Sequence, residues 1–457
     1  MPSPSQLSRA ALAAAAALAL AGCSTAGRVA VPTAAAEPIL AGVALGSAGG
    51  LPRDAALAAA LADVDPARIR RTDSTLVSFG TRHTMSDTLS ATRGAGAARR
   101  WIHAELSRVA AACGGCLRVE FDPGMVTVTR HPDKPSVNVV NVLAWLPGRD
   151  TTRVIVLGGH YDSCICNIDR FDATSDAPGA DDDGSGTSAV MELARVFAKH
   201  YPHGLDATVV FALYAGEEQG LLGSTHFAER LHAQGYTVVA GMTDDIDGNV
   251  IADDGSVDST SIRVFAGDPD NHPSRELLRH VWSVGELYQP SVTVLPVFRL
   301  DRIQRGGDHI PFHNKGDAAV RFTERLENYK RQHLPTDTLG AVSFGYVAKV
   351  ARLNGATIGT LAAAPPTPDS TAARRDQASG GQRWRLTWHR APNAVSYEVL
   401  LRRTTAPRWE RVIAVGTDTT MLLPVQLDDA YAGVRAVGAN GHRSLAAVVP
   451  AAAFVSR

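Results

Sequence analysis

A buried strand that ends in a histidine and a carboxylate decides the fold. The segment reads Val154-Ile155-Val156-Leu157-Gly158-Gly159-His160-Tyr161-Asp162. Its apolar run is typical of a strand that is covered on both faces of a sheet. A histidine at such a strand end can bind a metal ion through one ring nitrogen while a carboxylate orients the other.

Strand-like and helix-like segments alternate on both sides of this strand, between about residues 52 and 361. Strands are expected at 137–146, 154–159, 208–214, 238–246 and 318–323. Helices are expected near 94–113, 184–200, 221–234 and 274–287. This alternation predicts an α/β domain with a central, mostly parallel or mixed sheet between layers of helices.

Acidic residues and a second histidine follow several of these strands. They lie in Gly179-Ala180-Asp181-Asp182-Asp183-Gly184, Gly216-Glu217-Glu218-Gln219-Gly220, Asp244-Asp245-Ile246-Asp247-Gly248 and Gly306-Gly307-Asp308-His309. Each segment alone has a plainer explanation, such as acids that cap a helix. Because strand ends of an open α/β sheet meet at one edge, the His, Asp, Glu, Asp and His side chains together suit two divalent ions that share a carboxylate.

Five motifs in this order resemble the co-catalytic dizinc exopeptidases of clan MH, which include bacterial leucyl aminopeptidases and glutamate carboxypeptidases, with glutaminyl cyclases as relatives. They are His160-Tyr161-Asp162, Ala180-Asp181-Asp182-Asp183-Gly184, Gly216-Glu217-Glu218-Gln219-Gly220-Leu221-Leu222-Gly223-Ser224, Asp245-Ile246-Asp247-Gly248 and Asp308-His309-Ile310-Pro311-Phe312. The resemblance spans about residues 66–361. It implies the phosphorylase/hydrolase-like fold of zinc exopeptidases.

The resemblance also implies a role for each matching residue. Two zinc ions, with cobalt or manganese as substitutes, would share one bridging carboxylate and take two further ligands each. Residue by residue, Asp182 is the bridge, His160 and Asp245 complete one site, and Glu218 and His309 complete the other. Glu217 is the implied general base, and Asp162 orients His160. His333 resembles a family segment near the site and stays outside this ligand set.

The resemblance favours an aminopeptidase that removes N-terminal residues from peptides by means of a metal-activated water. A carboxypeptidase stays open because Arg299, Arg302, Arg305 and Arg321 could bind a substrate carboxylate. A glutaminyl cyclase is a further alternative, and an inactive surface-binding protein is a third. Residues that could line a specificity pocket, or only pack in the core, are Phe312, Phe322, Glu324 and Tyr329.

The composition changes at residues 362–381, where Pro365, Pro366 and Pro368 are followed by polar, glycine-containing sequence. This break indicates a linker to a smaller domain. Residues 382–457 carry short strand-like runs about 8–12 residues apart, which predict a β-sandwich. The segments Arg385-Leu386-Thr387-Trp388 and Tyr431-Ala432-Gly433-Val434-Arg435-Ala436-Val437 resemble a fibronectin type III module.

The N-terminus predicts export. Residues 1–22 resemble a lipoprotein signal peptide, Cys23 would carry the lipid anchor, and 23–51 would form a flexible tether. We expect a periplasmic or outer-membrane lipoprotein, or else a secreted protein. Disulfides among the remaining cysteines are plausible in such a compartment, with the pairing left open; these are Cys113, Cys116, Cys164 and Cys166.

Charge and hydropathy exclude two classes of protein. The 457 residues include 45 Lys and Arg against 46 Asp and Glu, which gives a net charge of −1. A chain without excess positive charge is not expected to bind nucleic acid. Since no apolar run reaches the roughly 20 residues that span a bilayer, a transmembrane protein is not expected either. Peptides remain the expected partners, and the sequence leaves the oligomeric state open.

Overall fold

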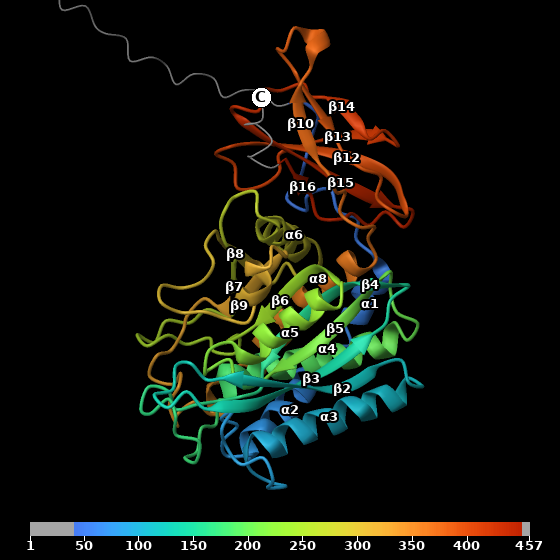
Figure 1. Ribbon diagram of the computed structural model, residues 1–457. Coiled ribbons are helices and arrows are strands. Elements are labelled where there is room, and N and C mark those ends of the chain that lie inside the picture. The colour runs from blue at the N-terminus through green and yellow to red at the C-terminus, as the bar shows by residue number, and fades with distance from the viewer. Residues whose placement is uncertain (1–40, 450–457) are drawn as a thin grey trace, which may run out of the picture. The chain divides into compact units, whose positions relative to one another are not determined.

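A mixed sheet of eight strands forms the centre of the larger α/β region in the computed structural model, which describes residues 41–449 (Figure 1). In spatial order the strands are β2 (Arg118–Thr127), β3 (Ser136–Leu146), β5 (Ala207–Tyr214), β4 (Asp150–His160), β6 (Thr237–Asp244), β9 (Ala319–Glu324), β7 (Ser261–Phe265) and β8 (Thr293–Val297). Strands β5, β4, β6 and β9 are parallel to one another. Their carboxyl ends therefore lie along one edge of the sheet.

Helices cover both faces of this sheet. They are α1 (Ala55–Leu61), α2 (Pro66–Ser78), α3 (Gly94–Ala112), α4 (Gly186–His200), α5 (Leu222–Ala233), α6 (Pro273–Tyr288), α7 (Ile310–Asn314) and α8 (Phe344–Ala362). Local sequence fixes where they begin. Asp65, for example, accepts a hydrogen bond from the Ala67 amide at 2.8 Å, and Pro66 occupies the first turn of α2. The predicted α/β architecture is confirmed.

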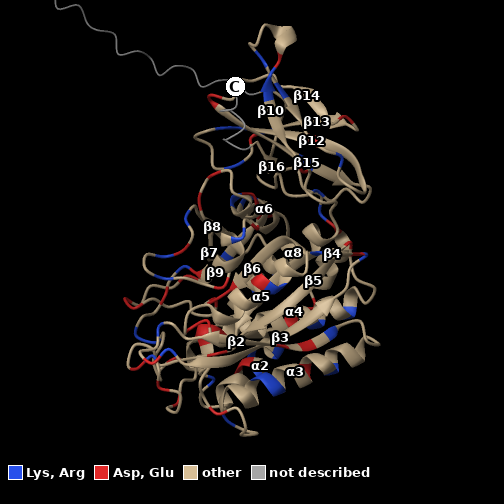
Figure 2. Cartoon of the chain, in the orientation of Figure 1, with Lys and Arg blue, Asp and Glu red and all other residues tan. Residues whose placement is uncertain are grey.

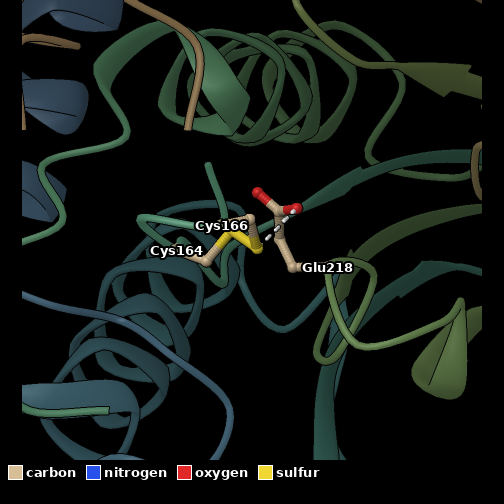
Figure 3. Close-up of side chains that lie close together, drawn as sticks. All are labelled: Cys164, Cys166 and Glu218. Atoms are coloured by element: carbon tan, nitrogen blue, oxygen red, sulfur yellow. Dashed lines mark hydrogen bonds between the residues drawn. A yellow bond between two sulfur atoms is a disulfide. The ribbon is translucent and has the colours of Figure 1, made fainter. Parts of the chain in front are cut away.

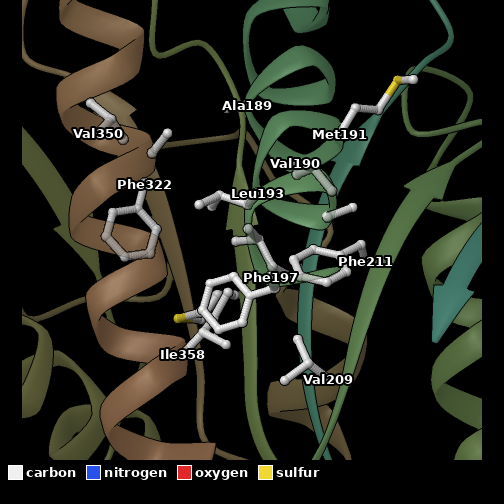
Figure 4. Packing of buried hydrophobic residues seen from close by; sticks show 14 of the residues in the cluster. Ala189, Val190, Met191, Leu193, Phe197, Val209, Phe211, Phe322, Val350 and Ile358 are labelled. Atoms are coloured by element: carbon white, nitrogen blue, oxygen red, sulfur yellow. The ribbon is translucent and has the colours of Figure 1, made fainter. Parts of the chain in front are cut away.

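Two apolar layers sandwich the sheet because successive side chains of a strand point to opposite faces. On β5, Val209 and Phe211 pack toward α4 and α8, against side chains such as Phe197 and Ile358 (Figure 4). The alternate β5 residues join a second cluster, with Phe227 of α5. Burial on both faces explains why the central strands are apolar throughout, and it fixes the sheet edge where the polar residues gather.

The C-terminal region consists of two antiparallel sheets. One contains β10 (Ala372–Arg375), β11 (Trp384–Thr387) and β14 (Thr420–Leu422); the other contains β1 (Val43–Ala44), β13 (Arg411–Gly416), β12 (Ala394–Arg403), β15 (Ala430–Gly438) and β16 (Ala447–Val448). The region has its own apolar core around Trp388, Tyr397 and Val434. The predicted all-β region is confirmed, and the likeness to fibronectin type III stays a prediction. Strand β10 lies inside the expected linker 362–381 and shortens it.

The N-terminal predictions fall mainly on residues that the structure does not describe. The signal peptide at 1–22, Cys23 and most of the tether at 23–51 lie outside the described residues. The tether prediction is wrong for its last part, because Val43 and Ala44 pair with Val412 and Arg411 and so cover the edge of β13. In the part of the chain that is described, no helix combines the length and apolar character needed to cross a bilayer.

Candidate metal centre

The parallel strands place three functional segments side by side. His160, at the end of β4, is in register with Tyr214 at the end of β5, and Gly158 is in register with Thr243 of β6. Glu217 and Glu218 follow β5 by a few residues, and Asp245 follows β6 directly. The sheet register therefore brings imidazole and carboxylate groups from distant parts of the sequence to one point.

Asp182 reaches the same point from the turn η1 (Ala180–Ser185), which precedes α4. The Asp337 carboxylate accepts hydrogen bonds from the Asp181 and Asp182 amides, both at 3.0 Å. Asp183 accepts from the His160 amide at 2.9 Å and from the Gly186 amide at the same distance. Because its neighbours hold the backbone, the side chain of Asp182 faces the imidazole and carboxylate groups at this point, and its two oxygens contact His160 and His333.

One group of donor atoms consists of His160, Asp182 and Asp245. His160 Nε2 lies 3.3 Å from an Asp182 oxygen and 3.8 Å from an Asp245 oxygen. All three residues are buried. The neighbouring Asp244 points away, toward Asn354 of α8. The geometry therefore brings Asp245, and not the adjacent Asp244, into this group.

The second group consists of Asp182, Glu218 and His333. His333 Nε2 lies 3.0 Å from an Asp182 oxygen and 3.3 Å from a Glu218 oxygen. Although burial alone would lower it, Glu218 and Asp182 raise the pKa of His333 to about 9. A field that favours an imidazolium also favours a metal cation. Asp182 belongs to both groups, as a bridging ligand would.

The donor set fits zinc, which binds imidazole nitrogens and carboxylate oxygens. Buried acids this close together repel one another unless cations balance them. Glu218 Oε1 has no hydrogen-bond partner among the described residues, and the nearest polar neighbours given for His160 Nε2 and Asp182 Oδ2 are other members of the two groups, which leaves all three atoms available to an ion. We call this set the acidic floor; its members are His160, Asp182, Glu217, Glu218, Asp245 and His333.

His309 does not join either group, and its predicted role as a ligand is wrong. Its ring is buried, and Nε2 lies 2.6 Å from the Leu300 carbonyl oxygen. His333 takes its place, from a loop outside the sheet. The only signal for His333 in the sequence was the resemblance of its segment to a family segment near the site. In the structure the Asp337 carboxylate, four residues later, accepts a hydrogen bond from the Asp182 amide and ties this loop to the floor.

Asp162 and Glu217 lie beside the two groups of donor atoms. The Asp162 carboxylate accepts from the Glu217 amide at 3.2 Å and from the Glu218 amide at 3.3 Å, and one of its oxygens is 3.6 Å from His160 Nδ1. Asp162 thus connects the β4 and β5 ends. Glu217 is partly buried, and its loss of hydration raises its pKa to about 7, which suits a group that exchanges protons near neutral pH.

Known proteins that are similar to this chain over most of its length are named zinc metalloproteases. A protein of Pyricularia oryzae named probable zinc metalloprotease is 39% identical over 428 residues, with 86% of this chain and 84% of that protein covered. One of the same name from Pyrenophora teres f. teres is 37% identical over 423 residues, with 86% of each covered. The model of peptidase family M28 matches residues 141–358. The chain belongs to peptidase family M28.

Solved structures share the fold of this M28 peptidase. LapB from Legionella pneumophila aligns with a TM-score of 0.54 at 21% identity and covers 70% of this chain and 77% of its own. The LapA aminopeptidase of the same organism aligns with a TM-score of 0.53 at 21% identity, with the same two coverages. At this identity the likeness concerns the fold.

A disulfide forms part of the site of this M28 peptidase. Cys164 and Cys166 are bonded to each other, and the Cys166 sulfur lies 3.7 Å from a Glu218 oxygen (Figure 3). Because a cysteine binds metal as a thiolate, the bridged sulfurs are not metal donors. The other pair is Cys113 and Cys116. Both disulfides are therefore local, which resolves the pairing that the sequence left open.

A cleft of about 380 Å³ opens over the acidic floor. Arginines line much of it; they are Arg130, Arg170, Arg302, Arg305 and Arg321. Arg299 is not among the lining residues. Figure 2 shows basic and acidic segments interleaved in the loops near β7, β8 and β9. We call four of these side chains the arginine rim: Arg130, Arg170, Arg302 and Arg305.

The other candidates for a specificity pocket lie elsewhere. Phe312 and Phe322 are buried in the two apolar layers. Glu324 is buried and accepts a hydrogen bond from the Asn249 amide at 2.6 Å. Tyr329 is 56% exposed and does not line the cleft. Core packing therefore accounts for the two phenylalanines.

Proposed function

We propose that this M28 peptidase is a zinc-dependent aminopeptidase that hydrolyses N-terminal residues from peptides. The observation that carries the proposal is the sharing of Asp182 between two groups of three donor atoms, with Glu217 beside them. The names of the fungal relatives support zinc as the metal. Cobalt or manganese would be substitutes.

Each side chain of the acidic floor has a distinct task in this proposal. His160 and Asp245 would hold one ion, Glu218 and His333 the other, and Asp182 would bind both. When bound, such a pair of ions lowers the pKa of water and polarises a substrate carbonyl. Asp162 keeps the His160 ring oriented, because its backbone carbonyl oxygen lies 3.2 Å from Nδ1 and its carboxylate 3.6 Å from the same atom, while Nε2 faces the other donors.

Glu217 would move the proton. It accepts a proton from the attacking water and returns it to the amine that leaves when the peptide bond breaks. The hydrogen bond from the Glu217 amide to Asp162 fixes the backbone that carries it.

The resemblance to aminopeptidases and the carboxylates that face the cleft support recognition of a free α-amine. A carboxypeptidase is the second candidate, favoured by the arginines that line the same cleft. A glutaminyl cyclase would work with one zinc, whereas the donor atoms here form two groups. An inactive binding protein is the weakest alternative because both groups are complete.

Short peptides with free, N-acetylated and C-amidated ends test the proposal. An aminopeptidase trims the free-amine peptides from the N-terminus, leaves the acetylated ones intact, and stops after chelation until zinc returns. Cleavage that requires a free carboxylate would instead establish a carboxypeptidase. If no peptide is hydrolysed in a metal-dependent manner, the proposal is wrong.

We further propose export through the N-terminal segment, with lipid attachment at Cys23. Both features belong to residues outside those described, and the two local disulfides are compatible with an oxidising compartment. Mass spectrometry of the purified protein would reveal the acyl chains. A mature chain that begins before Cys23 and carries no lipid would contradict the anchor.

A further inference from the structure

The arginines of the cleft come from four separate segments of the chain. Arg130 lies between β2 and β3, and Arg170 lies in the loop after β4. Arg302 and Arg305 belong to the loop between β8 and α7, whereas Arg321 belongs to β9. Four independent segments thus deliver positive charge to one cavity.

Two carboxylates outside the acidic floor balance only part of this charge. The Glu327 carboxylate forms ion pairs with three guanidinium groups. The N···O distances are 2.6 Å to Arg302, 2.9 Å to Arg305 and 2.5 Å to Arg263. The Asp301 carboxylate forms ion pairs with Arg302 and Arg321, each with an N···O distance of 3.1 Å. Four guanidinium groups therefore share two acids. Arg321 also pairs with Asp245 of the floor at 2.8 Å.

The other two arginines have no acidic partner within the described part of the chain. Arg170 donates one hydrogen bond, to the Glu218 backbone carbonyl at 2.8 Å, and this contact holds its guanidinium beside the floor. Arg130 is exposed and makes no hydrogen bond or ion pair within residues 41–449. A guanidinium presents five donors in a planar fork, and most of those on Arg130 and Arg170 are left for another molecule.

We propose that the arginine rim binds a carboxylate of the substrate close to the scissile bond, and that the enzyme therefore prefers anionic peptides. The proposal rests on the proposed peptidase function. Guanidinium and carboxylate groups match in shape and form paired, charge-assisted hydrogen bonds. The same positive charge would repel substrates with Lys or Arg at that position. The floor acids do not cancel this effect, because they face the proposed metal ions.

A purely structural role does not account for the whole rim. Arg302 and Arg305 have acids to hold, and they could serve only to fix the loop that contains Glu327. Arg130 and Arg170 have none. These two residues are therefore the ones to change.

The substrate carboxylate has two sources that the test separates. It belongs either to a Glu or Asp side chain near the N-terminus of the peptide or to the α-carboxylate at its C-terminus. Pairs of peptides that differ only by Glu against Gln isolate the first source. Pairs that differ only by a free or amidated C-terminus isolate the second.

The experiment compares kcat/KM of the zinc-loaded wild-type chain with that of the Arg130→Gln/Arg170→Gln double variant on these pairs. We expect the wild type to prefer the member with the extra carboxylate by about tenfold or more, and the double variant to lose most of that preference. Arg390→Gln, an exposed arginine of the C-terminal region, is the matched control and should keep the preference. Arg130→Lys/Arg170→Lys should restore part of it, because the charge returns without the planar fork.

Binding of the products gives a second readout. Calorimetric titration with glutamate and with glutamine should show tighter binding of glutamate to the wild type and a reduced difference in the double variant. If peptides are hydrolysed with no preference for either carboxylate, the rim proposal is wrong and the peptidase proposal stands. If no peptide is hydrolysed and the double variant still loses its preference for glutamate, the peptidase proposal fails alone.

Discussion

The acidic floor and the arginine rim face the same cleft but are built differently. Five of the six floor residues follow the parallel strands or lie in the turn η1, whose positions the buried sheet dictates. All four rim residues lie in loops, with Arg130 in the loop between β2 and β3. The sheet edge fixes the chemistry, and the loops above it are free to set which peptide is accepted.

The largest effect on activity is expected for Glu217, the one member of the acidic floor that is not proposed to bind metal. Glu217→Gln should lower kcat by about 10²–10⁴-fold, because the proton acceptor is lost. Two metal ions per chain should remain. The measurement is steady-state hydrolysis together with metal analysis, and Glu229→Gln, an exposed residue of α5, is the control. Unchanged turnover in Glu217→Gln would remove this residue from the mechanism.

Removal of metal should destabilise the fold, because the ions that we propose bind only to the folded acidic floor. A ligand at a free concentration about a thousand times its dissociation constant stabilises the folded state by about 4 kcal/mol. We therefore expect the midpoint of thermal unfolding to fall on chelation and to recover with zinc. In Asp182→Asn, which weakens both proposed sites, this zinc-dependent rise should be smaller. An equal rise in both proteins would place the metal elsewhere.

Glu327 should hold Arg302 and Arg305 of the rim in place through its ion pairs, and the stabilisation from these ion pairs should depend on pH. Although burial alone would raise it, Arg302, Arg305 and Arg263 lower the pKa of Glu327 from 4.5 to about 2. A pKa lowered by this much corresponds to stabilisation on the order of 3 kcal/mol. The contribution is present above the unfolded-state pKa, near 4.5, and is lost as the pH falls toward 2.

Urea unfolding of the Glu327→Gln variant measures the stabilisation that the Glu327 ion pairs contribute. At pH 7 the variant should have a free energy of unfolding lower than that of the wild type by that order of magnitude. The difference should shrink steadily below about pH 4.5. A difference that stays constant down to pH 3 would show that packing, and not charge, accounts for the effect.

The smallest effect is expected for Tyr329, which lies just outside the rim. Its ring centre is 6.0 Å from the Arg305 guanidinium carbon, and the residue is largely exposed. A cation–π contact at an exposed site contributes about 0.5–1 kcal/mol. Tyr329→Ala should therefore change kcat/KM by only a few fold. A loss of a hundredfold would assign substrate selection to an aromatic pocket and not to the arginines.

Sequence alone predicted the floor better than the rim. His160, Asp182, Glu217, Glu218 and Asp245 stand next to strands or a helix whose apolar patterns are plain. Each could therefore be placed at the sheet edge, and the structure brings them together. The family resemblance, and not a local pattern, implied Asp245 in place of its neighbour Asp244, which contacts Asn354 in the structure.

The second histidine shows the limit of this reasoning. His309 was implied as a ligand by its motif, Asp308-His309-Ile310-Pro311-Phe312, yet its ring turns toward the Leu300 carbonyl. His333 lies in a loop, where no periodic pattern indicates the direction of a side chain. The same holds for Arg130 and Arg170. Their positions depend on the path of long connections, which local sequence does not fix.

Metal content of three proteins tests the central claim most directly: that Asp182 is shared by two ions and that His333 holds the second. Wild type, His333→Gln and His309→Gln would be loaded with zinc, dialysed, checked for folding by circular dichroism and analysed by mass spectrometry. We predict two ions per chain in wild type and His309→Gln, and one in His333→Gln. Two ions in His333→Gln with one in His309→Gln would contradict the account.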